Sequence, residues 1–106
     1  MTAGNPEDRT VINPNTAINM DTRLSVGRGF RLQWEPAQQA HVLLYPEGMV
    51  KLNGSAGEIL KRCDGARTVG EIVSDIEGAF AAKGLANDVL AFMRMALEKR
   101  WLEIRT

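Results

Sequence analysis

The middle of the chain alternates apolar and polar residues in a way that predicts a small antiparallel sheet. FRLQWE at 30–35 has an apolar residue at every second position, which is the period of a half-buried strand. AHVLLY at 40–45 and GMVKL at 48–52 are predicted as two further strands. Between them, Pro46 presets the φ angle of a turn, and Gly48 is expected to take the left-handed conformation of a three-residue hairpin loop.

The third predicted strand is expected to keep one edge without a strand partner. A meander of three antiparallel strands has two free edges, and here helical sequence follows the third strand at once. The outer N–H and C=O groups of that strand then lack a partner unless something outside the chain supplies one. We take this free edge as the central hypothesis about function.

Capping signals predict where the next two helices begin. Asn53 is a suitable N-cap for the first helix, with Ser55 as an alternative, and Gly65 is suited to end it. Thr68 and Glu71 form the capping-box pattern that opens the second helix, because each side chain can satisfy the other residue's backbone amide.

A third helix is predicted to begin near Asp88, after Gly84 ends the second, and to run to about Arg100. Its apolar residues cover an arc of roughly 160°, whereas a helix with one contact shows an arc nearer 100°. The arc comprises Val89, Leu90, Phe92, Met93, Ala96 and Leu97. Two interpretations stay open: the arc fills a small core, or it serves a second surface beside the sheet edge.

Residues 1–28 differ from the rest of the chain, since they are rich in Asn, Thr, Asp, Pro and Gly and their apolar residues keep no period. Such a segment buries too little to offset roughly 1–2 kcal/mol of backbone entropy per ordered residue. We therefore predict a disordered tail or linker remnant over 1–28, with order only near Leu24 and Val26. The remaining residues, 29–106, are predicted to form one domain.

The charge balance argues against two classes of partner. The chain of 106 residues has 13 Lys and Arg against 13 Asp and Glu, so its formal net charge is zero. Proteins that bind nucleic acids or membrane surfaces normally carry excess positive charge. No apolar run reaches the length of a membrane span, and the N-terminus lacks a signal pattern. We expect a soluble, cytoplasmic protein that binds neither nucleic acid nor membrane.

The residues offer little for catalysis or for a metal. His41 and Cys63 are the one histidine and the one cysteine, and a metal site needs a cluster of ligands. Cys63 falls on the apolar face of the first predicted helix, where a free cysteine is usually an inert small hydrophobe. The glycines lack the strand–GxGxxG–helix context of a nucleotide site. We expect a protein that is not an enzyme and holds neither cofactor nor metal.

A winged-helix DNA-binding protein is the alternative function, since strands followed by three helices also suit that fold in another connection order. The third helix would then be the recognition helix. Its exposed side carries a mixture of charges that suits phosphates poorly. These residues are Asp88, Arg94, Glu98 and Lys99. The alternative rests on fold analogy alone.

Four stretches of the chain form a specific combination, although none of them is specific alone. They are YPEG at 45–48, LNGSAGEIL at 52–60, CDGARTVGEIV at 63–73, and the last helix leading into WLE at 101–103. Together they resemble the PqqD family, the peptide chaperones of pyrroloquinoline quinone (PQQ) biosynthesis. The resemblance covers about residues 26–104 and leaves the N-terminal tail unmatched.

The resemblance implies a RiPP recognition element, a domain that binds the precursor of a ribosomally made and later modified peptide. The implied fold is α+β and winged-helix-like, with a three-stranded antiparallel sheet followed by three helices. Family members bind the precursor as an added strand between strand 3 and helix 3, and they present it to a radical SAM enzyme that cross-links it. They hold no cofactor and carry out no chemistry themselves.

The resemblance also sets expectations for this chain. In some bacteria the module is fused behind the synthase that acts last in the pathway, which would make residues 1–28 a linker. We expect a monomer that binds the peptide through its third strand and third helix. The expected peptide-binding residues are Met49, Val50, Lys51, Leu52, Val89, Leu90, Phe92, Met93 and Leu97.

Overall fold

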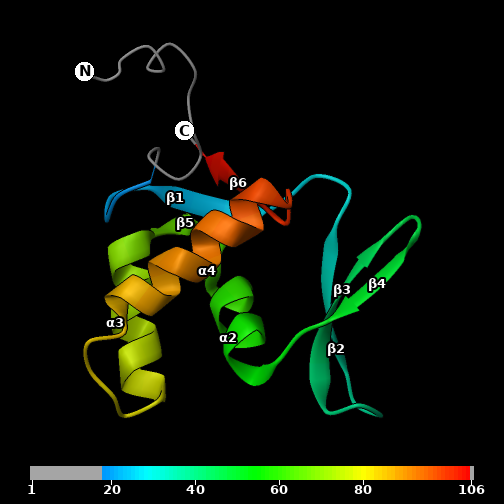
Figure 1. Ribbon diagram of the computed structural model, residues 1–106, viewed down its shortest axis with the longest axis horizontal. Helices are drawn as coiled ribbons and strands as arrows, with labels where there is room; N and C mark the ends of the chain where they lie inside the picture. Colours follow the sequence, from blue (N-terminus) through cyan, green and yellow to red (C-terminus); the bar gives the residue numbers. More distant parts are fainter. Residues whose placement is uncertain (1–17, 106) are drawn as a thin grey trace.

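The computed structural model describes residues 18–105 and contains two three-stranded sheets and three helices (Figure 1). One sheet has the order β2-β3-β4, with β2 at Arg31–Glu35, β3 at Ala40–Tyr45 and β4 at Gly48–Lys51. The other has the order β5-β1-β6, with β1 at Arg23–Val26, β5 at Asp64–Thr68 and β6 at Leu102–Arg105. The helices are α2 at Gly54–Arg62, α3 at Val69–Ala79 and α4 at Ala86–Glu98.

The predicted α+β class, with an antiparallel sheet followed by three helices, is confirmed. The connection between β3 and β4 differs from the expected one. Tyr45 pairs directly with Gly48, so only Pro46 and Glu47 form the turn. The φ angle of Gly48 is not positive, and the expected three-residue loop with a left-handed Gly48 is therefore wrong.

The sheet β5-β1-β6 was not predicted, and it moves the start of the domain. β1 is the central strand of this sheet, and Leu24 within it is completely buried. Ile18 is only 7% exposed and belongs to the same core. The order expected near Leu24 and Val26 is present as β1, but the expected tail is wrong for the other residues of 18–28. Residues 1–17 lie outside the described part of the chain.

The predicted starts of the first two helices are confirmed, and the third begins at Ala86, two residues before the expected Asp88. The Asn53 side chain accepts a hydrogen bond of 2.8 Å from the amide of Ala56, so Asn53 is the N-cap of α2. Thr68 and Glu71 form both bonds of the capping box at the start of α3, at 3.2 and 2.8 Å. The first helix ends earlier than expected, at Arg62, because β5 begins two residues later.

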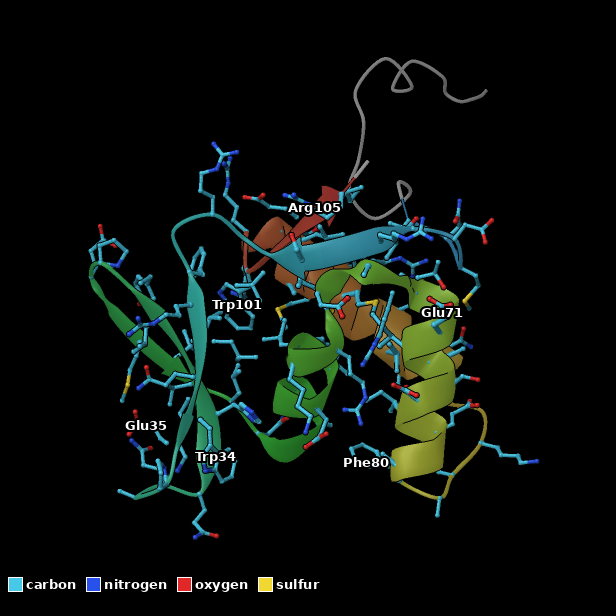
Figure 2. All side chains as sticks on the ribbon, turned by 180° about the vertical axis from the view of Figure 1, so that it is seen from behind. Trp34, Glu35, Glu71, Phe80, Trp101 and Arg105 are labelled. Atoms are coloured by element: carbon cyan, nitrogen blue, oxygen red, sulfur yellow. The ribbon has the colours of Figure 1, made fainter. Side chains whose placement is uncertain are left out.

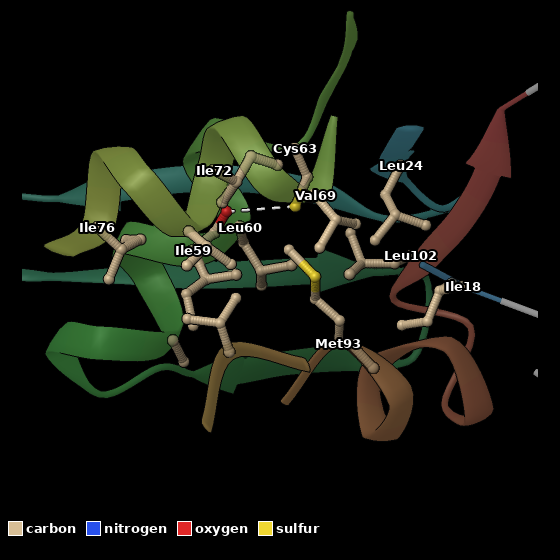
Figure 3. Close-up of a cluster of buried hydrophobic side chains, with 14 of the residues drawn as sticks. Ile18, Leu24, Ile59, Leu60, Cys63, Val69, Ile72, Ile76, Met93 and Leu102 are labelled. Atoms are coloured by element: carbon tan, nitrogen blue, oxygen red, sulfur yellow. Dashed lines mark hydrogen bonds between the residues drawn. The ribbon is translucent and has the colours of Figure 1, made fainter. Parts of the chain in front are cut away.

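One hydrophobic core joins the two sheets and the three helices (Figure 3). Leu24 and Leu102 come from the second sheet, Leu43 from β3, and Ile72 and Met93 from the helices. The sheet β2-β3-β4 extends to one side of the molecule, and α2 lies between it and α3 (Figure 1). Among the described residues, no helix has the length and apolar character needed to cross a bilayer.

Candidate functional site

Strand β4 has one paired edge and one edge without a strand partner among the described residues. Its only strand neighbour is β3, and the amide of Leu52 just after it donates to the carbonyl of His41 at 3.0 Å. In an antiparallel pair, the residues whose main chains face the partner strand alternate with residues whose main chains face away. Val50 therefore faces β3, while the N–H and C=O groups of Met49 and Lys51 point outward.

The outward-facing ladder ends where α2 begins. The carbonyl of Asn53 accepts the amide of Gly57 at 3.0 Å, so this carbonyl already has a partner inside the helix. The free edge thus offers two donors and two acceptors, from Met49 and Lys51. An extended segment laid along it would form up to four main-chain hydrogen bonds.

Beside this edge lies a mostly apolar groove of about 460 Å³. The end of β4 and one side of α4 both line it. Side chains from α2 and α3 also line it, together with Leu85 and Trp101. The lining residues are Val50, Lys51, Leu52, Asn53, Ser55, Ala56, Ile59, Ile76, Phe80, Leu85, Asp88, Val89, Phe92, Met95 and Trp101.

The side of α4 that lines the groove is one face of the helix. Asp88, Phe92 and Met95 are spaced by four and three residues, which places them above one another on the helix surface. Met93 and Ala96 lie on another face and are completely buried in the core. Of the wide apolar arc, only Val89 and Phe92 line the groove, and all six of its residues belong to the core or pack against it.

Five of the nine expected peptide-binding residues line the groove, namely Val50, Lys51, Leu52, Val89 and Phe92. Met49 supplies outward main-chain groups, and its side chain is 49% exposed. Leu90 and Leu97 are partly buried against the core and do not line the groove. Met93 has no exposed surface, so its expected place on a binding surface is wrong.

The expected set lacked the residues that come from other elements. Ile59 of α2 and Ile76 of α3 line the groove, and so do Phe80 just after α3 and Trp101 after α4. Ile59, Ile76 and Phe80 lie on the apolar faces of their helical segments, which is typical of core residues. Only their positions in the folded chain show that they border a cavity. Met95 carried a usable signal, because it extends the Asp88–Phe92 row by three residues.

An ion-pair network fixes α2 against α3, the two helices that contribute Ile59 and Ile76. Arg62 donates to a carboxylate oxygen of Glu58 at 2.7 Å and lies 3.5 Å from a carboxylate oxygen of Asp75. The hydrogen bond from Arg62 lowers the pKa of Glu58, with a further contribution from Lys61. The network joins the C-terminal part of α2 to the middle of α3.

The one cysteine is part of the core. The Cys63 thiol is 4% exposed and lies 3.3 Å from the carbonyl oxygen of Ile59, to which it donates (Figure 3). Burial raises its pKa to about 12, and the negative charge of Asp64 adds to this effect. The thiol therefore stays protonated near neutral pH. Within residues 18–105, His, Cys, Asp and Glu side chains form no group of three that could hold a metal ion.

Comparison with known proteins gives consistent matches. Residues 40–102 match the family model of coenzyme PQQ synthesis protein D (PqqD). A PqqA binding protein of Stutzerimonas stutzeri is 55% identical over 82 residues, which are 76% of this chain and 89% of that protein. A PqqA binding protein of Pseudomonas aeruginosa is 51% identical over 88 residues, 82% of this chain and 96% of that protein.

A solved structure matches as well. The solution NMR structure of the PqqD truncation of Methylobacterium extorquens PqqCD superposes with a TM-score of 0.69 at 32% identity. The match covers 87% of this chain and 99% of that one. That truncation is described as a functional and stand-alone RiPP recognition element.

Proposed function

Since the chain belongs to the PqqD family, we propose that it binds a PqqA-type precursor peptide by strand addition between β4 and α4. The relatives are named for binding PqqA, which supports the nature of the ligand. The observation that carries the mode of binding is the free edge of β4 beside an apolar groove walled by α4. In this mode, main-chain hydrogen bonds give affinity and pockets for alternate side chains give selectivity.

The groove is needed because the strand edge alone is too weak. Each main-chain bond contributes roughly 0.5–1.5 kcal/mol, while ordering a flexible peptide costs about 2–5 kcal/mol. Four bonds from Met49 and Lys51 therefore little more than offset the ordering cost. Apolar side chains of the peptide, placed against Ile59, Val89 and Phe92, would supply the remainder. Together they give an affinity of about micromolar.

We further propose that the bound peptide is presented to a radical SAM enzyme that cross-links it. Membership of the PqqD family supports this role. The peptide would be held along β4 while its remaining residues stay accessible to the second protein. Variants that lose the peptide should then slow the cross-linking reaction at limiting peptide concentration. Saturating peptide should restore the rate.

A pair of proline variants tests strand addition. Proline removes one main-chain N–H group. In Lys51→Pro the lost N–H points away from β3, so we expect a stable fold and a loss of peptide affinity of at least about tenfold. In Val50→Pro the lost N–H faces Leu43, so the sheet itself should be destabilised. Calorimetric titration measures the peptide affinity, and thermal unfolding measures the stability of the fold.

Lys51→Ala is the matched control, because it removes the same side chain and keeps the N–H group. It should bind the peptide nearly as well as the wild type. Equal affinity of Lys51→Pro and Lys51→Ala would overturn strand addition at β4. The same titration with duplex DNA tests the DNA-binding alternative, which requires an affinity that falls steeply with salt.

A further inference from the structure

Strand β2 is the other edge of the sheet β2-β3-β4, on the side away from β4. Because the main chain of His41 faces β4, the main chains of its neighbours Ala40 and Val42 face β2. Their partners are Glu35 and Gln33. The main chains of the alternating residues of β2 therefore point outward, and no strand pairs with this edge within residues 18–105.

The two outward-facing residues are Leu32 and Trp34. The Trp34 side chain is 51% exposed, and its ring meets the ring of His41 edge-on at a centroid distance of 5.0 Å. It is one of the few large apolar side chains on the described surface. Trp34 and Glu35 lie at the end of β2 far from Arg105 (Figure 2). This edge is thus both unpaired and partly apolar.

The polar side chains on the opposite face of β2 are held in a row. A guanidinium nitrogen of Arg31 donates to Gln33 at 3.3 Å, and the amide nitrogen of Gln33 donates to Glu35 at 2.6 Å. The row therefore runs from a positive end to a negative end with Gln33 at its centre. Such a strand is complementary to itself when it is reversed in direction.

A second copy of β2 can pair with this edge in the antiparallel direction, with Gln33 of one copy opposite Gln33 of the other. This register suits both the main-chain groups and the side chains of the edge. Leu32 of one copy would face Trp34 of the other, so their outward N–H and C=O groups would form four hydrogen bonds in two reciprocal pairs. The same pairing places the two apolar side chains opposite each other on one face of the sheet. On the other face, Arg31 of each copy meets Glu35 of the other, and opposite charges in cross-strand pairs are stabilising.

We propose that two copies of the chain associate through β2, antiparallel about Gln33, to form one continuous six-stranded sheet. The association is isologous and closes after two copies, since the same strand serves both partners. It differs from the expected monomer. Both β4 edges lie at the outer ends of the joined sheet, so self-association and peptide binding use different strands. The proposed dimer can therefore be tested independently of the proposed peptide binding.

Charge variants of β2 test the pairing. Arg31→Glu leaves both ends of the row negative, and Glu35→Arg leaves both ends positive, so each variant repels its own copy. Each should dimerise about tenfold or more weakly than the wild type. An equimolar mixture should restore dimers, because every Glu then faces an Arg across the interface. Sedimentation over a wide range of protein concentration gives the masses and the dissociation constants.

Two proline variants separate the edges. Trp34→Pro removes an outward N–H group and the exposed ring without touching a bond to β3, and it should abolish dimers while keeping peptide affinity. Lys51→Pro should keep the dimers. A monomeric mass at all concentrations, or dimers that the charge variants leave unchanged, would overturn the proposal. The proposal would also be overturned by assemblies larger than dimers if Lys51→Pro abolished them. Such assemblies would indicate that β2 of one copy pairs with β4 of another.

Discussion

Phe92 and Met93 are neighbours in the sequence and lie on different surfaces of the protein. Successive residues of a helix are rotated by about 100°, so one of the two can face the groove while the other faces the core. Phe92 lines the groove and is partly buried, whereas Met93 is completely buried. The two functions of α4, packing and the proposed binding, are thus separated at the level of single residues.

Alanine variants of these two residues should differ in what they lose. Met93→Ala removes completely buried atoms and leaves a cavity, so it should cost about 2–5 kcal/mol of unfolding free energy. Phe92→Ala should cost less stability and weaken peptide binding by about tenfold, because the peptide loses an apolar wall. Chemical unfolding and calorimetric titration measure the two quantities. Loss of stability in both variants with unchanged affinity would mean that α4 serves only the core.

The sequence predicted the width of the apolar arc on α4 but not which of its rims faces β4. The period of a helix is a local property, and it fixes which residues share a face. The direction of that face depends on how α4 packs against α2, α3 and β6, which are contacts between distant parts of the chain. This is why the sequence alone did not separate Val89 and Phe92, which line the groove, from Met93, which is buried in the core.

At the scale of elements, local signals were predicted well and pairing over long distances was not. The capping residues Asn53 and Thr68 act on amides three residues away, so a short window of sequence contains the whole interaction. Strand β1 pairs with β5 and β6, which lie about 40 and 80 residues further along. Strand β1 has only four residues, and Leu24 is its one completely buried side chain. This pattern is too short to predict such a strand.

The capping box of α3 gives a prediction at this scale. Thr68→Ala removes the acceptor of the Glu71 amide, so it should cost about 1 kcal/mol of unfolding free energy. Thr68→Ser keeps the hydroxyl group and should stay close to the wild type. Thermal unfolding of the two variants provides the measurement. A Thr68→Ala variant as stable as Thr68→Ser would show that the cap contributes nothing to α3.

At the scale of the whole molecule, the sheet β5-β1-β6 joins segments from the beginning, the middle and the end of the described chain. Leu24 of β1 and Leu102 of β6 are both buried in the common core. The carbonyls of Met20 and Thr22, just before β1, accept the first two amides of α3 at 2.9 and 2.8 Å. The residues that precede β2 are therefore part of the fold that holds α3 in place.

A pair of truncations tests this role. A chain that begins at Gly27 lacks Ile18 and the central strand β1, so β5 and β6 lose their shared partner and the core loses Leu24. We expect this chain to unfold without a cooperative transition. A chain that begins at Ile18 keeps all the described contacts and serves as the control. Cooperative unfolding of both chains at the same temperature would show that β1 is dispensable.

Hydrogen exchange at β4 is the most direct test of the central claim, that the peptide becomes a fourth strand of the sheet. In the free protein, the amides of Val50 and Leu52 face β3 and should exchange slowly, while those of Met49 and Lys51 face solvent and should exchange fast. Saturating peptide should slow the exchange of the Met49 and Lys51 amides. The same peptide concentration should leave the exchange of the Leu32 and Trp34 amides unchanged. Unaltered exchange at Met49 and Lys51 in the saturated complex would contradict strand addition at β4.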